Sequence, residues 1–223
     1  MSLFKTQPER MARAPQHEQG LNGRHGDKVY YTVNGITYVR AYVVPDHSDP
    51  SELQTMGWDR FYMANQFVKP LTKVFRLGFI NFKTGMRSPA KVGLSKFLKT
   101  AFKEGEPNPN PDLLEVSGGD LTGMSGGSAE WKDEETVLVK WFNNAGEGNA
   151  ANRDRISVLL YDTESLRSFH CLEANSRSRE MQEIRIRNPD RHKGKLHVYA
   201  FFTFKNPRNG KYEVSRTVYL GKV

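Results

Sequence analysis

The chain has 223 residues, of which 37% are hydrophobic and 11% aromatic, and it contains a single cysteine. A chain of this length can bury one large core or two small ones, and this composition is typical of a globular protein. The formal net charge of +8 favours negatively charged partners, such as phosphate backbones, acidic proteins or anionic surfaces.

Residues 1–26 are polar and show no apolar periodicity, which predicts a flexible arm. The arm contains no apolar segment of the kind that forms a secretory signal peptide. No apolar run elsewhere approaches the length of a membrane span, so we expect no integral membrane protein. The lone Cys171 fits a reducing compartment. We therefore expect the protein in the cytoplasm or within an assembled particle.

A β-hairpin gives the sharpest local signal. Residues 29–33 and 36–43 are β-branched and aromatic runs that are separated by Asn34 and Gly35. Asn-Gly tolerates the positive φ angles of a type I′ turn, which matches the twist of the flanking strands. A two-stranded ribbon is marginally stable alone, so one face must pack on something else, and the exposed edge favours strand addition. The candidate interaction residues of this hairpin are Tyr30, Tyr31, Asn34, Gly35, Tyr38 and Arg40.

Two helical segments follow. The first begins around Asp49, Pro50 and Glu52, which form a capped helix start, and it ends near Gly78. Pro70 lies within it and predicts a kink or a break, because proline removes a backbone hydrogen bond. The second helix begins at Ser88, whose side chain is expected to cap it because a proline follows at the first helical position, and it runs to about residue 104. The first carries one apolar stripe of Leu53, Met56, Phe61, Ala64, Phe67, Val68, Leu71, Val74 and Phe75.

From Lys69 to Lys103 the chain carries nine basic residues and no Asp or Glu. Such a one-signed stretch is typical of nucleic-acid binding, although a helix also places lysine toward solvent for solubility alone. Sequence-independent nucleic-acid binding by the basic helix 83–103 is therefore the alternative function. Its candidate phosphate- or anion-binding residues are Lys83, Arg87, Lys91, Lys96, Lys99 and Lys103. A second basic cluster, diluted by acidic residues, contains Arg177, Arg179, Arg185, Arg187, Arg191, Lys193 and Lys195.

Residues 105–111 are rich in proline and mark a domain boundary. Beyond them the apolar period changes from helical to two, which predicts strands separated by turns. Seven antiparallel strands in about a hundred residues are typical of an immunoglobulin-like sandwich. The predicted strands cover residues 113–116, 136–142, 155–161, 166–172, 181–186, 196–204 and 212–220.

The sequence thus predicts an α+β protein, in which an N-terminal β-hairpin with two to three helices precedes a seven-stranded sandwich. Its parts are a flexible arm, a hairpin-plus-helices unit, a proline-rich linker and a β-sandwich, at residues 1–26, 27–104, 105–111 and 112–223. The sandwich resembles fibronectin type III modules, because Trp141 ends the second long strand and residues 196–202 lead through a glycine turn to Val214 and Ser215. Such modules lack the inter-sheet disulfide, in agreement with the single cysteine.

Nearly the whole chain also resembles an uncharacterised family of bacterial proteins common in Bacteroidota. The residues that carry the resemblance are 20–23, 34–40, 60–61, 67–71, 75–79 and 215–221. The family has no assigned activity, so the resemblance implies an architecture and no chemistry. This chain differs from the family pattern in a longer leader before Gly20 and in more basic helices.

No set of residues forms a recognisable catalytic or metal site. His170 and Cys171 are neighbours in a predicted strand and point to opposite faces, so they cannot pair as base and nucleophile, and we interpret Cys171 as structural. Ser125 fits Gly-x-Ser-x-Gly but lies outside a strand-to-helix turn, so we interpret residues 123–127 as a flexible linker. The six histidines show no metal-ligand spacing, and we expect no cofactor.

The leading hypothesis is a non-enzymatic structural or interaction protein, a subunit or docking module of a larger assembly such as a virion. Sandwiches of this kind are adhesion and assembly modules more often than catalysts, which is an argument by analogy of fold. We expect a protein partner or self-association, nucleic acid in the alternative, and no small-molecule substrate. A hydrolase that uses Ser125 or Cys171 is the least favoured interpretation, because no base is placed beside either residue.

Overall fold

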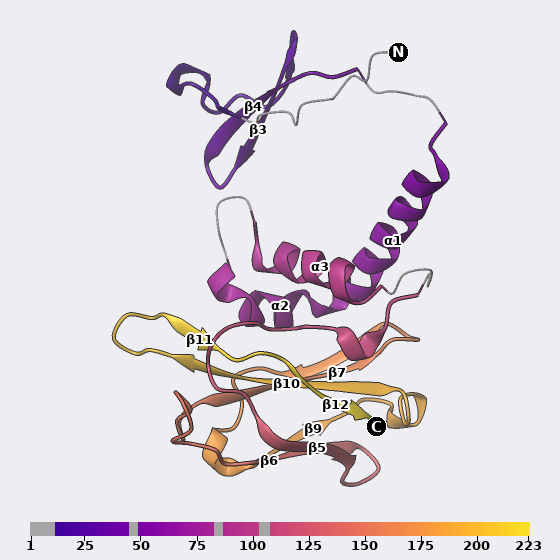
Figure 1. The fold of residues 1–223 in the computed structure, drawn as a ribbon, viewed down its shortest axis with the longest axis vertical. Coiled ribbons are helices and arrows are strands. Elements are labelled where there is room, and N and C mark those ends of the chain that lie inside the picture. Colours follow the sequence, from indigo (N-terminus) through magenta and orange to yellow (C-terminus); the bar gives the residue numbers. More distant parts are fainter. Residues whose placement is uncertain (1–11, 45–48, 83–86, 103–107) are drawn as a thin grey trace. The chain divides into compact units, whose positions relative to one another are not determined.

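A computed structural model describes residues 12–44, 49–82, 87–102 and 108–223 (Figure 1). The chain divides into two compact units, and the boundary lies between residues 51 and 52. This differs from the boundary that the sequence suggested at residues 105–111. The helices belong with the β-strands that follow them, because their apolar faces pack on those strands. The two units are described separately below.

The N-terminal unit is a four-stranded antiparallel sheet in the order β1-β4-β3-β2. The predicted hairpin is confirmed as β3 (Lys28–Val33) and β4 (Ile36–Ala41), in which Val33 pairs with Ile36 across the turn. Asn34 and Gly35 have φ angles of 52° and 78°, which the type I′ turn requires.

The described part of the predicted arm is structured, which corrects the expectation of flexibility for residues 12–26. Strand β1 (Ala12–Arg13) pairs with β4, and β2 (Gly23–His25) pairs with β3. A short 3-10 helix, η1 (Gln16–Glu18), lies between them. Polar contacts hold this segment: Gln19 Nε2 donates to the Ala14 carbonyl at 2.6 Å, and the Gly20 amide donates to Thr37 Oγ1 at 2.8 Å. Because these contacts are polar, they produce no apolar periodicity from which the sequence could predict the structure of this segment.

The second unit begins with helices. Helix α1 (Glu52–Val68) is followed by a 3-10 turn, η2 (Lys69–Leu71), and then by α2 (Thr72–Gly78), so the predicted break at Pro70 is confirmed. A further 3-10 turn, η3 (Ile80–Phe82), precedes α3 (Pro89–Thr100). The Ser88 hydroxyl caps α3 as predicted, by accepting the Lys91 amide at 3.4 Å. Helix α1 begins at Glu52, slightly later than expected.

Two antiparallel sheets form the rest of this unit, which confirms the α+β class and is compatible with the predicted sandwich. One sheet has the order β11-β10-β7-β8, with β12 also paired to β10, and the other has the order β5-β6-β9. The strands are β5 (Ser125–Trp131), β6 (Thr136–Phe142), β7 (Arg155–Asp162), β8 (Arg167–Cys171), β9 (Met181–Arg185), β10 (Leu196–Lys205), β11 (Tyr212–Val214) and β12 (Val218–Lys222).

Two predicted strands and one predicted linker need correction. Residues 113–116 form no strand, because residue 113 ends a 3-10 turn, η4 (Pro111–Leu113), and residues 114–116 are irregular. The last predicted strand is interrupted at residues 215–217 and becomes β11 and β12. The supposed flexible linker contains the start of β5, which pairs with β6 through a bulge between Ser125 and Ser128. Gly126 is required in this bulge, because a Cβ there would lie 2.0 Å from the Phe142 ring.

The β11-β10-β7-β8 sheet is apolar on both faces, and helices cover the face that the other sheet leaves free (Figure 1). On the helix side, Tyr161 of β7 and Tyr199 of β10 pack with helix residues such as Phe67. The Tyr161 hydroxyl donates to the Phe67 carbonyl at 2.6 Å, and the Tyr199 hydroxyl donates to the Pro111 carbonyl at 2.8 Å. Burial raises the pKa of both phenols, so both remain protonated donors.

Arg177 is the largest fully buried side chain in the described chain and lies at one end of the sandwich core. The sequence had placed it in a basic cluster that is diluted by acidic residues. Its Nη2 lies 3.1 Å from Asp154 Oδ2, and its guanidinium stacks 3.8 Å from the centre of the Phe202 ring. The remaining donors bind loop acceptors on Thr122, Gly123 and Asn144. One buried cation therefore joins the loops that close this end of the sandwich.

Replacing Arg177 by methionine is expected to lower the free energy of unfolding by about 3–5 kcal/mol, because Asp154 would remain buried without its ionic partner. Urea denaturation measures the loss. Arg179→Met is the matched control, since Arg179 lies exposed on the same 3-10 turn, and its effect should stay within about 0.5 kcal/mol. Equal losses in the two variants would contradict the role of Arg177.

Candidate functional site

The predicted basic helix is only partly available for an anion. Lys91, Lys96 and Lys99 lie on α3, and Arg87 precedes it, while Lys83 and Lys103 lie outside the described residues. Lys96 Nζ forms an ion pair with Glu115 Oε2 at 2.8 Å and lies 5.3 Å from the centre of the Phe79 ring. Glu115 thus supplies an acidic partner from outside the acid-free stretch. Arg87, Lys91 and Lys99 are exposed.

The hairpin residues do not form one surface. Tyr31 and Tyr38 face each other across the strands, with ring centres 5.9 Å apart, and Arg40 follows on the same face by the alternation of the strand. Tyr30 is buried on the other face, and Asn34 and Gly35 form the turn. Strands β1 and β2 already pair with parts of both hairpin edges. The room for strand addition is therefore smaller than the sequence suggested.

A clearer candidate surface lies on the first half of α1. The predicted apolar stripe is buried at Ala64, Phe67 and Val68, where α1 packs into its own unit. Farther toward the helix start, the stripe continues with Leu53, Met56 and Phe61, whose exposed fractions are 80%, 49% and 52%. We call these three residues the exposed α1 stripe. Trp58 and Tyr62 add exposed aromatic rings beside it.

A second candidate is a cavity of about 840 Å³ between α2, β8 and residues 187–195. Its lining includes the cationic side chains of Lys73, Arg167, Arg187 and Arg191, all exposed. We call this space the basic cavity. The basic cavity could not be predicted from the sequence, because its cationic residues come from segments far apart in the chain.

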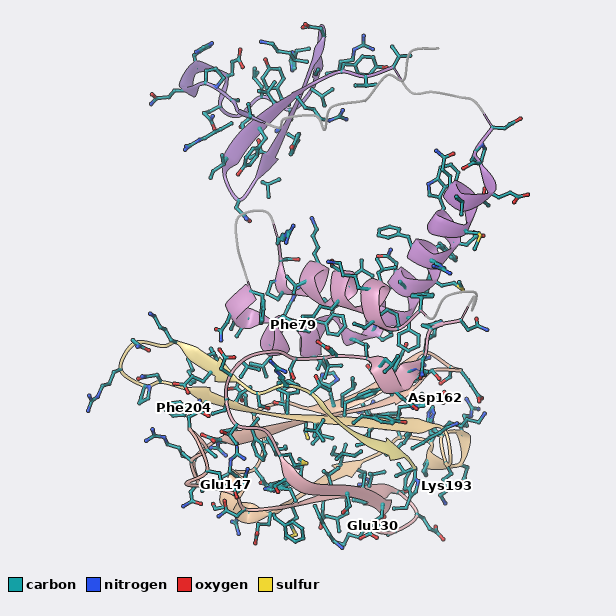
Figure 2. All side chains as sticks on the ribbon, viewed as in Figure 1. Phe79, Glu130, Glu147, Asp162, Lys193 and Phe204 are labelled. Carbon is teal, nitrogen blue, oxygen red and sulfur yellow. The ribbon has the colours of Figure 1, made fainter. Side chains whose placement is uncertain are left out.

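Both acidic residues that line the basic cavity have partners within the protein. Asp162 lies at the end of β7 (Figure 2). It is 1% exposed, and its Oδ1 accepts the amides of Glu164 and Ser165, each at 3.0 Å. Asp162 Oδ2 lies 2.8 Å from Nδ1 of the buried His192. Burial alone would raise the pKa of Asp162, but hydrogen bonds from Ser165, His192 and Glu164 outweigh it and lower the pKa. Lys195 pairs with Glu164 at 2.7 Å.

His170 and Cys171 occupy opposite faces of β8, as expected for neighbours in a strand. His170 lines the basic cavity, and burial together with the nearby charge of Lys73 lowers its pKa, so the imidazole is neutral at pH 7. Cys171 packs against the core between the sheets, and burial raises the pKa of its thiol to about 11. A thiol with this pKa is protonated at neutral pH and is a weak nucleophile.

Within the part of the chain that the structure describes, no group of three or more His, Cys, Asp and Glu side chains is arranged to hold a metal ion. Nor does any helix among these residues have the length and apolar character needed to span a membrane.

The chain belongs to a protein family of unknown function (DUF6266), whose model matches residues 20–221. This confirms the resemblance to an uncharacterised family that the sequence indicated. No curated protein and no solved structure matches the chain. The function must therefore be argued from the surfaces described above.

Asp162→Asn is expected to lower the free energy of unfolding at pH 7 by about 1.5–3 kcal/mol, because hydrogen bonds to a charged acceptor are lost. The native pKa of Asp162 lies below its ordinary value of 3.8, so its contribution is complete above that pH and is lost as the pH falls below it. The difference in unfolding free energy between the wild type and Asp162→Asn should therefore become smaller as the pH falls. Urea denaturation between pH 7 and pH 3 measures it. Asp190→Asn is the exposed control, and a deficit that is constant with pH would contradict this account.

Proposed function

We propose that this protein is a non-enzymatic interaction protein that self-associates through the exposed α1 stripe and acts as a subunit or docking module of a larger assembly. The observation that carries the proposal is the continuation of the stripe beyond the part of α1 that its own unit covers. Large apolar side chains gathered on one helix face are typical of interaction surfaces.

The lack of packing at the start of α1 also supports a partner. Most helical stability in proteins comes from packing of an apolar face, because short helices are marginal in water. Residues 51–59 are all exposed, so the start of α1 gains little from such packing within its own unit. A partner that covers Leu53, Met56 and Phe61 would supply the missing contacts.

Gly57 favours a second copy of the chain as that partner. A Cβ at Gly57 would meet no atom within 4 Å, so the described residues of this chain offer no packing reason for glycine there. Glycine costs about 1 kcal/mol relative to alanine inside a helix. In an antiparallel pair of α1 helices that cross at Gly57, Leu53 of one copy would face Phe61 of the other, because each is four residues from the crossing. Such a contact is self-complementary and closes as a two-fold dimer.

Sequence-independent nucleic-acid binding by the basic helix 83–103 remains the second candidate function. It is supported by Lys91 and Lys99, which are exposed on α3. It is weakened by Lys96, whose ammonium group is engaged by Glu115. As part of the same proposal, the protein would act in the cytoplasm or within an assembled particle.

The double variant Leu53→Ala/Phe61→Ala is expected to weaken self-association at least about tenfold, because it removes the central apolar contacts. Sedimentation equilibrium over a range of protein concentrations measures the change. Phe142→Ala/Met181→Ala removes comparable exposed apolar surface elsewhere and should leave the association unchanged.

Gly57→Leu separates assembly from folding. It should weaken the dimer by blocking the close helix crossing, and it should leave the monomer at least as stable, because leucine favours the helix. A wild-type protein that is monomeric at every concentration would refute self-association. A complex with short mixed-sequence DNA that dissociates at high salt would favour the second candidate instead.

A further inference from the structure

We propose that the basic cavity binds a small molecule that carries more than one phosphate group. The cavity occupies about 840 Å³, and none of its lining residues comes from α1. The proposal is therefore independent of self-association. It rests on the charge balance of the lining, on the kind of cation that supplies the charge, and on the size of the space.

The charge balance leaves the cavity strongly positive. The lining acids are engaged within the protein, Asp162 by His192 and Glu164 by Lys195. Lys73, Arg167, Arg187 and Arg191 form no ion pair with any described residue. Positive charges held around a concavity repel one another and create a strong positive potential within it. An anion that binds among them reduces this electrostatic repulsion.

The cations themselves indicate phosphate. Three of the four are arginines, and the planar guanidinium donates paired hydrogen bonds to two oxygens of one phosphate. They come from β8 and from the segment after β9, while Lys73 approaches from α2, so the positive charge reaches the space from several sides. Several cations around one space match an anion with several charges better than a single carboxylate.

The volume of the basic cavity and its remaining lining residues also fit a small molecule with more than one phosphate group. The volume is within the range of about 300–1,000 Å³ that small-molecule sites occupy, and it exceeds what one inorganic phosphate fills. The neutral His170 and the ring of Phe169, which lies 5.1 Å from that of His192, give the lining less charged parts. A diphosphate, or the phosphate chain of a nucleotide, fits both features.

The basic cluster from Arg177 to Lys195 did not indicate this site in the sequence, because its members lie in different places in the fold. Arg177 is buried against Asp154, Arg185 pairs with Glu135 at 2.6 Å, and Lys193 lies 3.8 Å from Asp190. Only Arg187, Arg191 and Lys195 of that cluster line the cavity. Folding adds Lys73 and Arg167 to them.

Calorimetric titration of the full chain with pyrophosphate, at constant ionic strength, tests the proposal. We expect saturable binding to one site. Arg187→Ala/Arg191→Ala should weaken it at least tenfold, because both side chains are exposed and their loss removes ligand contacts without opening the core. Arg179→Ala/Arg208→Ala removes the same charge from exposed positions outside the cavity and should leave the affinity within about twofold.

The outcomes separate the proposal from its rivals. Absence of pyrophosphate binding to the wild-type chain, or equal losses in the two double variants, would overturn it. Citrate that binds as tightly as pyrophosphate would overturn the assignment to phosphate. Competition by ATP would support the proposal and identify a nucleotide as the source of the phosphates, whereas pyrophosphate binding that ATP leaves unchanged would support it with a free polyphosphate as the source.

Discussion

The packing of the helices on one face of the β11-β10-β7-β8 sheet is the constraint on which the second unit depends. A buried tyrosine must keep a partner for its hydroxyl group, and Tyr161 and Tyr199 find theirs in backbone carbonyls at Phe67 and Pro111. These two hydrogen bonds tie the end of α1 and the segment after α3 to the central strands. Because the other face of the same strands packs on the β5-β6-β9 sheet, β10 must be apolar on both sides, and it is buried from Leu196 to Thr203.

This one interface also creates both candidate surfaces. The helix residues that this interface buries begin at Ala64, so the apolar stripe that continues toward Leu53 stays exposed among the described residues. The interface also places η2 against β8, where the Ser168 hydroxyl donates to the Pro70 carbonyl at 3.1 Å. Lys73 follows η2 in the chain and so lines a space whose other cations come mainly from β8 and the segment after β9. The sandwich therefore positions the groups, and the helices complete the site.

Features that depend on a few neighbouring residues could be predicted from the sequence. The Asn34-Gly35 turn, the break at Pro70 and the Ser88 cap are of this kind, because each is fixed by local backbone chemistry. Features that depend on distant partners could not. In the sequence, Arg177 cannot be distinguished from the other basic residues near it. Its burial depends on Asp154 and on acceptors in loops that are distant in the chain. Strand β5 has glycines at its second and third positions, which favour a loop in the sequence, and only the fold places the Phe142 ring against Gly126. The α1 stripe had the right period, but periodicity does not tell which half of a helix is covered.

The two surfaces differ in the force that would act on them, and this difference gives them opposite responses to salt. The exposed α1 stripe would associate by removing apolar side chains from water, which excluded salts such as sulfate strengthen. The basic cavity would bind through charges at exposed positions, which added ions screen over a Debye length of about 8 Å at physiological ionic strength. Neither surface needs the other, because the stripe lies in the first half of α1 and the cavity is lined by residues from α2, β7, β8 and the segments after β7 and β9. A chain of this design can assemble through one element while a phosphate-bearing ligand reaches the other, so assembly and ligand binding need not compete.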